Sequence, residues 1–307
     1  MKSISVQTRI QLRNVLYCTD LSPSASSALP QAVALARHFG STLHALHVRP
    51  ALLYIWSFST AAPLLVEPTE AQLREKIEDS LSGFSDARKE ILIEEGVDIW
   101  LAISNAIEER EIDLVVLSTQ GRSGLSKILL GSVAEEILRL APCPVLTVGP
   151  NAPMEPFQDA NYTEILYATD FTPEACAAAP YAVSLAQEFQ AHLTLLHVLA
   201  EPEPGDLVTR AELQSGTECL LRQMVPPESE LWCEPHLMIG QGTPANEILD
   251  VAQQRKSDLI VLGVRRPGGV STRLPIATAH KVVSKAACPV LTVRGSCYER
   301  VARTNSY

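Results

Sequence analysis

The segment STQGRSGLSKILLGSVAEEI, residues 118–137, contains residue types that could hold a phosphate group. Gly121 and Gly131 follow an apolar run, and Gly131 directly precedes Ser132, which together with Glu135 has the Ser-x-x-Glu spacing of a helix capping box. A helix N-terminus offers unpaired N–H groups and a positive dipole end, and a preceding glycine lets an anion approach closely. The alternative is a loop in which the glycines only make turns and Ser132 only caps the helix.

Motifs for other kinds of chemistry are missing from the chain. It has no Gly-x-Ser-x-Gly elbow, no Gly-x4-Gly-Lys-[Ser/Thr] loop and no Gly-x-Gly-x-x-Gly fingerprint. The pairs His44/His47 and His192/His197 are spaced so that, on a strand, the two rings point to opposite faces, and neither pair is expected to share a metal ion. No base or nucleophile stands out beside the glycine loop. We therefore expect a binding protein rather than an enzyme.

Composition and charge restrict the class of protein further. Hydrophobic residues make up 46% and charged residues 20% of the chain, which is typical of folded α/β proteins. The formal net charge of −10, with no basic excess in either half, argues against nucleic acid as a partner. The seven cysteines include no Cys-x-x-Cys pair, and Cys143 and Cys288 lie in strand-like runs, so we expect reduced, buried thiols.

The N-terminal residues MKSISVQTRIQLR contain no apolar core of a signal peptide. The apolar stretch Ala51–Val66 is shorter than the roughly 20 residues of a membrane span and is interrupted by Pro63. The sequence therefore predicts no membrane span and a soluble, cytoplasmic protein.

An internal repeat defines the domain organisation. NVLYCTDLSP (14–23) recurs as EILYATDFTP (164–173) and LHALHV (43–48) as LTLLHV (193–198), while IDLVVL (112–117) recurs as SDLIVL (257–262) and APCPVLTV (141–148) as AACPVLTV (286–293). The chain is therefore a tandem of two homologous domains. The predicted boundaries are a first domain at 1–150, a linker at 151–161, a second domain at 162–295 and a tail at 296–307.

Each copy alternates short β-branched apolar runs with helical stretches, which is typical of βα units around a buried parallel sheet. In the first copy we expect strands near 14–19, 43–48, 97–101, 113–117 and 144–148, and helices near 24–39, 69–95, 104–111 and 132–140. The predicted fold is α/β, with two tandem doubly wound, Rossmann-like domains of five parallel strands each. In such sheets ligands bind at the carboxyl ends of the strands, so Asp20 and the glycine loop should meet there.

The order of ILYxTDxSP, LLHV, DLIVLG, Gly-x9-Gly-Ser and APCPVLTV resembles the universal stress protein family, over nearly the whole chain and twice. Nucleotide-binding members carry Gly-x2-Gly-x9-Gly-[Ser/Thr] after the fourth strand, and Ser118 stands at the position of the first glycine. The resemblance implies an adenine nucleotide α-hydrolase-like fold, and ATP or a related adenine nucleotide in the first domain, with no metal beyond Mg²⁺ brought by the nucleotide.

Asp20 can accept hydrogen bonds from the ribose or the adenine, and the resemblance implies that Val48 and Leu117 border the base. The expected binding residues are Cys18, Thr19, Asp20, Val48, Leu117, Ser118, Gly121, Gly131, Ser132 and Val133. The implied function is that of a nucleotide-dependent regulator or interaction module in stress response. The alternatives are a scaffold that binds no nucleotide and, less favoured, a slow ATPase.

The second copy departs from the motif. Its loop begins Gly263-Val264-Arg265-Arg266, and the Gly-Ser pair is replaced by Ile276-Ala277. We expect isoleucine before the helix to block phosphate, so that this copy has lost the triphosphate site. A residual role remains open for Asp170 and Gly263 toward a nucleoside, or for the two arginines toward another anion. The first copy, with Val97-Asp98-Ile99 in place of Gly242-Thr243-Pro244, is expected to be shortened between its third strand and third helix.

Two surfaces are candidates for assembly. The apolar strands Val145–Val148 and Val290–Val293 end their domains, and an uncovered edge strand invites pairing. By resemblance, the two copies are expected to form a pseudo-twofold pair within one chain through these strands. The segment Ala51–Val66, with Trp56 and Phe58, is expected either to join chains into a homodimer or to fold over its own domain as a flap.

Overall fold

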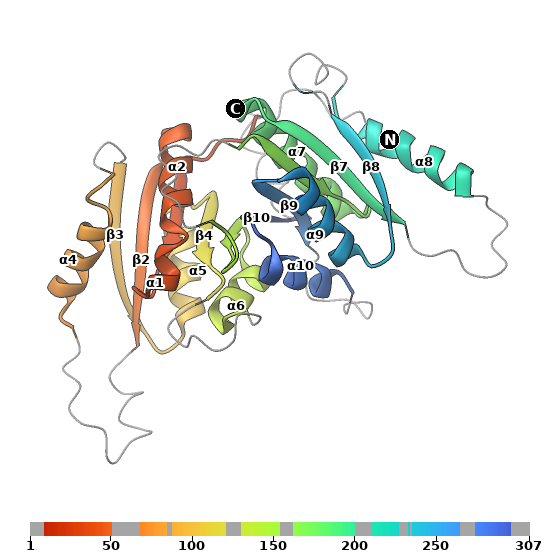
Figure 1. The fold of residues 1–307 in the computed structure, drawn as a ribbon. Coiled ribbons are helices and arrows are strands. Elements are labelled where there is room, and N and C mark those ends of the chain that lie inside the picture. The colour runs from red at the N-terminus through yellow and green to blue at the C-terminus, as the bar shows by residue number, and fades with distance from the viewer. Residues whose placement is uncertain are drawn as a thin grey trace. The chain divides into compact units, whose positions relative to one another are not determined.

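The structure is a computed structural model that describes residues 9–50, 68–84, 88–120, 130–153, 162–199, 210–226, 233, 235–264 and 274–295. It divides into two compact α/β units, coloured along the chain in Figure 1. The N-terminal unit comprises Gln11–Ala141 and Met154–Ala160, and the C-terminal unit comprises Met1–Ile10, Pro142–Pro153 and Asn161–Tyr307. None of the helices within the described residues is long and apolar enough to cross a membrane.

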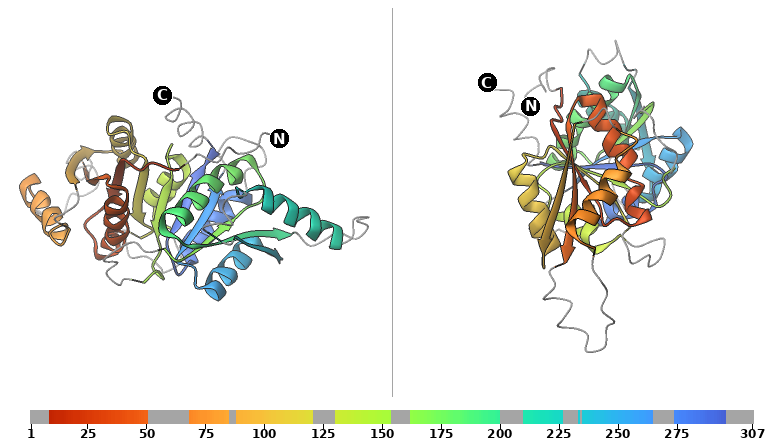
Figure 2. Two further views of the ribbon diagram at one scale, coloured as in Figure 1. Left: turned by 90° about the horizontal axis from the view of Figure 1, so that it is seen from above. Right: turned by 90° about the vertical axis from the view of Figure 1, so that its left-hand side faces the viewer.

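The N-terminal unit is a parallel sheet with strand order β3-β2-β1-β4. Its elements are β1 (Asn14–Cys18), α1 (Pro23–Ser26), α2 (Leu29–Phe39), β2 (Thr42–Pro50), α4 (Glu70–Ser80), β3 (Arg88–Gly96), α5 (Ile99–Glu109), β4 (Leu114–Ser118) and α6 (Ser132–Leu140). Figure 2 shows α2 and α4 on one side of these strands and α5 on the other. Helices on both faces bury the middle of β1 and β4, which explains the apolar runs Val15–Tyr17 and Leu114–Leu117.

The C-terminal unit repeats this arrangement with strand order β10-β9-β6-β7-β8. Its elements are β5 (Val145–Val148), β6 (Glu164–Ala168), α7 (Pro173–Phe189), β7 (His192–Leu199), α8 (Arg210–Gln223), β8 (His236–Gln241), α9 (Pro244–Arg255), β9 (Leu259–Val264), α10 (Leu274–Lys285) and β10 (Val290–Arg294). The five strands β10, β9, β6, β7 and β8 pair in parallel. The prediction of two tandem doubly wound α/β domains is confirmed.

Strand β5 belongs to the C-terminal unit, where it pairs with β10 in antiparallel orientation. The pairing has internal symmetry, because Thr147 Oγ1 donates to the Val290 carbonyl and Thr292 Oγ1 donates to the Val145 carbonyl, each at 3.2 Å. The last strands of the two copies therefore pair with each other, as their apolar sequence predicts. The segment Ala51–Val66 lies outside the described residues.

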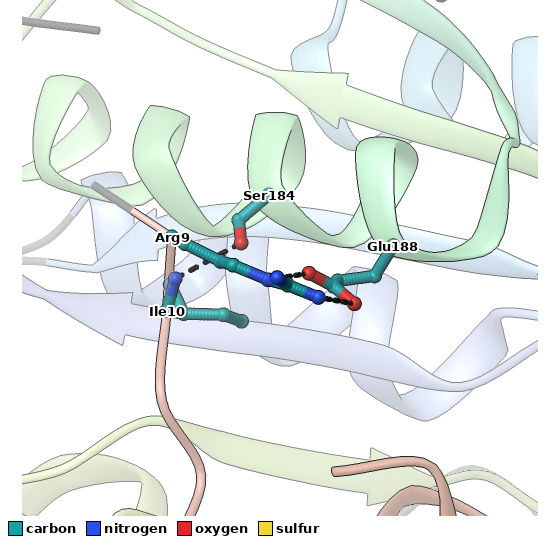
Figure 3. A network of polar contacts seen from close by, with 4 residues as sticks. All are labelled: Arg9, Ile10, Ser184 and Glu188. Atoms are coloured by element: carbon teal, nitrogen blue, oxygen red, sulfur yellow. Dashed lines mark hydrogen bonds and ion pairs between the residues drawn. The ribbon is translucent and has the colours of Figure 1, made fainter. Parts of the chain in front are cut away.

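Residues from the start of the chain also belong to the C-terminal unit. The Ile10 backbone N–H donates to Ser184 Oγ on α7 at 3.0 Å, and the Arg9 guanidinium forms a two-point ion pair with the Glu188 carboxylate (Figure 3). Ile10 is buried, so this short arm adds apolar contact as well as polar bonds. A bidentate pair of this kind is more favourable than a single contact, although Arg9 itself is largely exposed.

The region around the third strand of the first copy differs from the sequence prediction. The expected strand at 97–101 is the start of helix α5, and the expected helix at 69–95 ends at Ser80 and is followed by β3. Asp98 caps α5 by accepting from the Leu101 N–H at 3.1 Å, and Thr243 occupies the same N-cap position before α9. Two residues separate strand from helix in both copies, so the predicted shortening is wrong.

His44 lies buried in β2, and its ring contacts both neighbouring strands. Nδ1 lies 3.0 Å from Glu90 Oε2 on β3, and Nε2 lies 3.2 Å from Asn14 Oδ1 on β1. Burial is the main reason that the pKa of His44 lies below its ordinary value; Arg110 lowers this pKa as well, whereas Glu90 raises it.

This lowered pKa predicts a pH-dependent stability. Because folding disfavours the protonated ring, His44 contributes stability that is fully present above its unfolded pKa and is lost as the pH falls through about 6.5 toward the folded pKa. His44→Thr, which introduces the residue found at the matching position Thr194, should reduce the loss of stability between about pH 7.5 and about pH 5.5. Denaturant unfolding at both pH values measures the difference, and equal losses in both proteins would contradict the prediction.

Candidate functional site

The N-terminal unit contains a cavity of about 320 Å³ where β1, β2 and β4 end and α6 begins. The structure brings nine of the ten sequence-predicted binding residues to its wall, namely Cys18, Thr19, Asp20, Val48, Leu117, Ser118, Gly131, Ser132 and Val133. The tenth, Gly121, lies outside the described residues. The cavity thus occupies the position in which doubly wound sheets bind ligands.

The loop after β1 holds Asp20 in a fixed conformation. Asp20 Oδ1 accepts from the Ser22 N–H at 2.9 Å, and Leu21 between them has a φ of 62°, which a leucine rarely adopts. The second copy repeats this turn with Asp170, whose Oδ1 accepts from the Thr172 N–H at 3.1 Å, and Phe171 at a φ of 59°. Because the same strained turn occurs twice, it belongs to the shared fold, and it places a carboxylate at the end of the first strand.

A histidine supports this loop in each unit. His47 Nδ1 donates to the Thr19 carbonyl at 2.9 Å, and His197 Nδ1 donates to the Thr169 carbonyl at 2.8 Å. A carbonyl only accepts, so the proton on each ring is assigned to Nδ1. The interpretation of these histidines as strand-end structural residues agrees with these contacts, and the described residues include no cluster of three or more side chains suited to a metal ion.

The start of α6 forms the polar end of the cavity. Gly131, not Ser132, is the N-cap residue, and it has a φ of −63° and a ψ of 148°. Its N–H donates to the Thr119 carbonyl at 2.9 Å, and its own carbonyl accepts the first helical bond, from the Glu135 N–H at 2.8 Å. The predicted capping box is therefore wrong, because Ser132 is already the first helical residue and Glu135 lies one position too late. Gly131 provides no capping side chain, and the first turn of the helix lines the cavity.

The apolar wall of the cavity extends beyond Val48 and Leu117, the two apolar residues that the resemblance implies beside the base. Leu46 from β2 and Ala25 from α1 lie on it together with Ile99 and Ile103, one turn apart on α5. The remaining lining residues are His47, Thr119, Gln120 and Ala134. The spacing of Ile99 and Ile103 was the available signal, but the stretch IWLAI reads equally well as a strand. A cavity lined both by apolar side chains and by a helix N-terminus suits a ligand with one apolar and one anionic end.

Cys18, which lines the cavity, and its neighbour Tyr17 both have raised pKa values. Burial raises the pKa of the Cys18 thiol to about 12, so this thiol is not a nucleophile near neutral pH. Burial likewise raises the pKa of Tyr17 to about 12, and its hydroxyl donates to the Ala25 carbonyl at 3.1 Å. That bond anchors α1 to β1, and Tyr167 anchors α7 to β6 in the same way at 2.6 Å.

The second copy differs from the first at the positions of Gly131 and Ser118, where it has Ile276 and Gly263. Helix α10 already begins at Leu274, so Ile276 and Ala277 lie inside its first turn rather than before it, which corrects the expected position of the isoleucine. Gly263 contacts the start of α7: a Cβ built on it would lie 2.3 Å from Ala175 Cα and 2.4 Å from the Glu174 carbonyl oxygen. The start of α7 fills the space that a side chain at position 263 would need, and the suggested role of Gly263 toward a nucleoside stays a prediction. Arg265 and Arg266 lie outside the described residues.

Thr119 provides a prediction on stability. It is 2% exposed, and its Oγ1 finds no hydrogen-bond partner within the described part of the chain. The matching residue of the C-terminal unit is Val264, also buried. Thr119→Val keeps the shape and removes an unsatisfied hydroxyl, so it should stabilise the protein by about 1 kcal/mol.

Thermal unfolding of Thr119→Val measures this, with Thr147→Val as the matched control. Thr147 is equally buried, but its Oγ1 donates to the Val290 carbonyl, so that the control should be neutral or less stable than the wild type. A loss of stability in Thr119→Val as large as in the control would show that the Thr119 hydroxyl has a partner in solution.

The sequence profile of the universal stress protein family matches residues 11–149 and again 161–294. The chain therefore belongs to the universal stress protein family, with two copies of its domain. A universal stress protein of Methanocaldococcus jannaschii is 32% identical over 142 residues, which cover 43% of this chain and 82% of the relative. One of Mycolicibacterium smegmatis is 23% identical and covers 91% of this chain and 96% of its own. The crystal structure of a universal stress protein from Archaeoglobus fulgidus matches with a TM-score of 0.66 and 22% identity, covering 94% of this chain and 98% of that chain.

Proposed function

We propose that the N-terminal unit binds ATP or a related adenine nucleotide and that the protein acts in stress response as a nucleotide-dependent regulator or interaction module. The observation that carries this proposal is the cavity, which is lined both by apolar side chains and by the N-terminus of α6 with Gly131 at its cap. Gly131 has an ordinary φ, so the backbone does not require glycine there; what the missing side chain provides is access to the first N–H groups of the helix.

The base and ribose have partners in the same cavity. Val48 and Leu117 provide apolar contacts for the adenine, and Asp20 accepts hydrogen bonds from sugar hydroxyls or the exocyclic amine. The phosphates then point toward Ser132 and Val133 at the helix start. The lining residues hold this ligand without an activated nucleophile, since the Cys18 pKa is raised and no carboxylate pair faces the helix start among the lining residues. The protein is therefore proposed to be a binder rather than an enzyme.

The experiment is identification of the ligand that remains bound during purification. Mass spectrometry of small molecules released from the intact chain should detect an adenine nucleotide, and calorimetry with ATP and with GTP should show a preference for ATP. If no nucleotide is released and neither titration shows binding, the alternative of a nucleotide-free scaffold is correct. Product analysis after long incubation with ATP and Mg²⁺ tests slow hydrolysis.

The two units should differ in binding. Because α10 begins three residues earlier than α6 does in the aligned copies, and because the start of α7 fills the space beside Gly263, the C-terminal unit should hold no triphosphate. Calorimetry with the full chain should then give one ATP per chain. Two equivalent sites, or triphosphate density in both halves of a crystal structure with ATP, would contradict this asymmetry.

A further inference from the structure

The first helix after the first strand differs between the two units. Helix α7 runs without interruption from Pro173 to Phe189, whereas the matching stretch is divided into α1 and α2. At the break, the Ser27 N–H donates to the Ser24 carbonyl at 3.3 Å and the Ala28 N–H to the Ala25 carbonyl at 3.2 Å, which are the i to i−3 bonds of a tighter turn. A proline within the stretch is not the cause, because the two copies have one at matching positions, 30 and 180.

The strand residue that faces the start of the helix also differs. In the C-terminal unit it is Gly263, and the helix approaches so closely that a Cβ there would lie within 2.6 Å of three backbone atoms of Glu174 and Ala175. In the N-terminal unit the same position is Ser118, which has a Cβ and a hydroxyl. Its Oγ lies 3.5 Å from Ser27 Oγ, at the break itself. Helix α1 therefore cannot approach β4 as α7 approaches β9.

We infer that Ser118 holds α1 away from the end of β4 and so sets the width of the cavity. Ala25 on α1 and Ser118 on β4 both line this cavity, so any approach of the two elements narrows it. Ser118 is thus a positioning residue for the nucleotide, an inference that rests on the proposed function. The Ser118 side chain therefore keeps the cavity open, and a glycine at this position would be unfavourable for nucleotide binding in this chain.

The hydroxyl bonds of Ser118 are too long to explain the break. Its Oγ accepts from the Gln120 N–H at 3.4 Å, and the 3.5 Å separation from Ser27 is at the limit of a hydrogen bond. Ser27 donates its one hydroxyl proton over a shorter distance, 2.8 Å, to the Ser24 carbonyl. The volume of the Ser118 side chain, chiefly its Cβ, is therefore the cause that the contacts favour.

Serine hydrogen bonds within the helix are a second possible cause of the break between α1 and α2. Serines that bond back to carbonyls of the preceding turn can bend a helix, and Ser26 and Ser27 both do so. The variant Ser27→Ala removes that bond and leaves Ser118 unchanged. If Ser118 sets the break, Ser27→Ala retains it.

The experiment compares Ser118→Gly, Ser118→Ala and Ser27→Ala in the full chain, each by crystal structure and by calorimetric titration with ATP. We expect Ser118→Gly to join α1 and α2 into one helix against β4 and to weaken ATP binding about tenfold, which corresponds to about 1.4 kcal/mol. Ser118→Ala keeps the Cβ, so it should keep the break and should lose less ATP affinity than Ser118→Gly. Ser27→Ala should behave in the same way.

The outcomes separate this inference from the proposed function. A divided helix in Ser118→Gly, or affinity that is unchanged or improved in that variant, overturns the role of Ser118. An equal loss in Ser118→Ala and Ser118→Gly assigns the effect to the hydroxyl and overturns the steric account. If the wild type binds no ATP, the proposed function fails, and the crystal structure of Ser118→Gly alone decides whether Ser118 sets the position of α1.

Discussion

Replacing Gly131 by valine should abolish adenine-nucleotide binding, with affinity falling at least about 100-fold, or about 2.7 kcal/mol. Gly131 is the N-cap of α6 and lines the cavity, and the N–H groups that follow it are the candidate phosphate donors. A branched side chain at this position would occupy the space that a phosphate needs. The lost hydrogen bonds are charge-assisted, which makes their removal more costly than that of neutral bonds.

The fold should tolerate this substitution. A φ of −63° and a ψ of 148° lie in the extended region that valine favours, so the backbone is not strained. Valine is a poor N-cap residue, but glycine provides no side-chain cap either, so the cost should be about 1 kcal/mol or less. Ile276→Val at the matching position of the second copy is the control, and it should leave ATP affinity unchanged. Calorimetry decides: unchanged affinity in Gly131→Val would rule out the phosphate site at α6.

The sequence predicts the buried elements of this fold well and the peripheral ones poorly. Strands β1 and β4 have apolar residues at their buried centres, so their positions agree with the expectation to within about one residue. Strand β3 has one buried residue, Leu92, in a sequence rich in charge, RKEILIEEG, and this pattern on its own favours a helix. The reverse error concerns α5, where Ile99 is 37% and Leu101 56% exposed. Apolar residues on the exposed face of a helix obscure the 3.6-residue spacing of hydrophobic residues by which a helix is recognised.

The residues of the candidate site likewise fall into those that the sequence predicts and those that only the structure shows. Residues within local motifs, such as Asp20 and the Gly131-Ser132 pair, could be placed from the sequence because the strand end and the helix start lie next to them in the chain. Ile99 and Ile103 reach the cavity through packing of α5, which no local pattern specifies. The consequences of Ser118 and Gly263 depend on a helix about 90 residues away in sequence, so only the structure shows what each permits.

Gly263→Ser should destabilise the C-terminal unit by about 3 kcal/mol, near the upper end of the usual cost of overpacking. The new Cβ would lie 2.3 Å from Ala175 Cα, 2.4 Å from the Glu174 carbonyl oxygen and 2.6 Å from the Ala175 nitrogen. These are backbone atoms of the first turn of α7, so no side chain can rotate away to relieve the overlap. That turn is also fixed by the Thr172 cap and by the Tyr167 hydroxyl, which donates to the Ala175 carbonyl.

Two further variants make this prediction specific. Gly263→Ala should lose nearly as much stability as Gly263→Ser, because the overlap begins at Cβ. Gly216→Ala, in the same unit, is the matched control: a Cβ there has nothing within 4 Å, and a helical Gly→Ala change should stabilise by up to about 1 kcal/mol. Thermal unfolding measures all three, and a loss of 3 kcal/mol corresponds to about 10 °C in a unit of this size. If Gly263→Ser and Gly263→Ala unfold at the same temperature as the wild type, α7 does not approach β9 closely. The difference that we infer between Gly263 and Ser118 is then wrong as well.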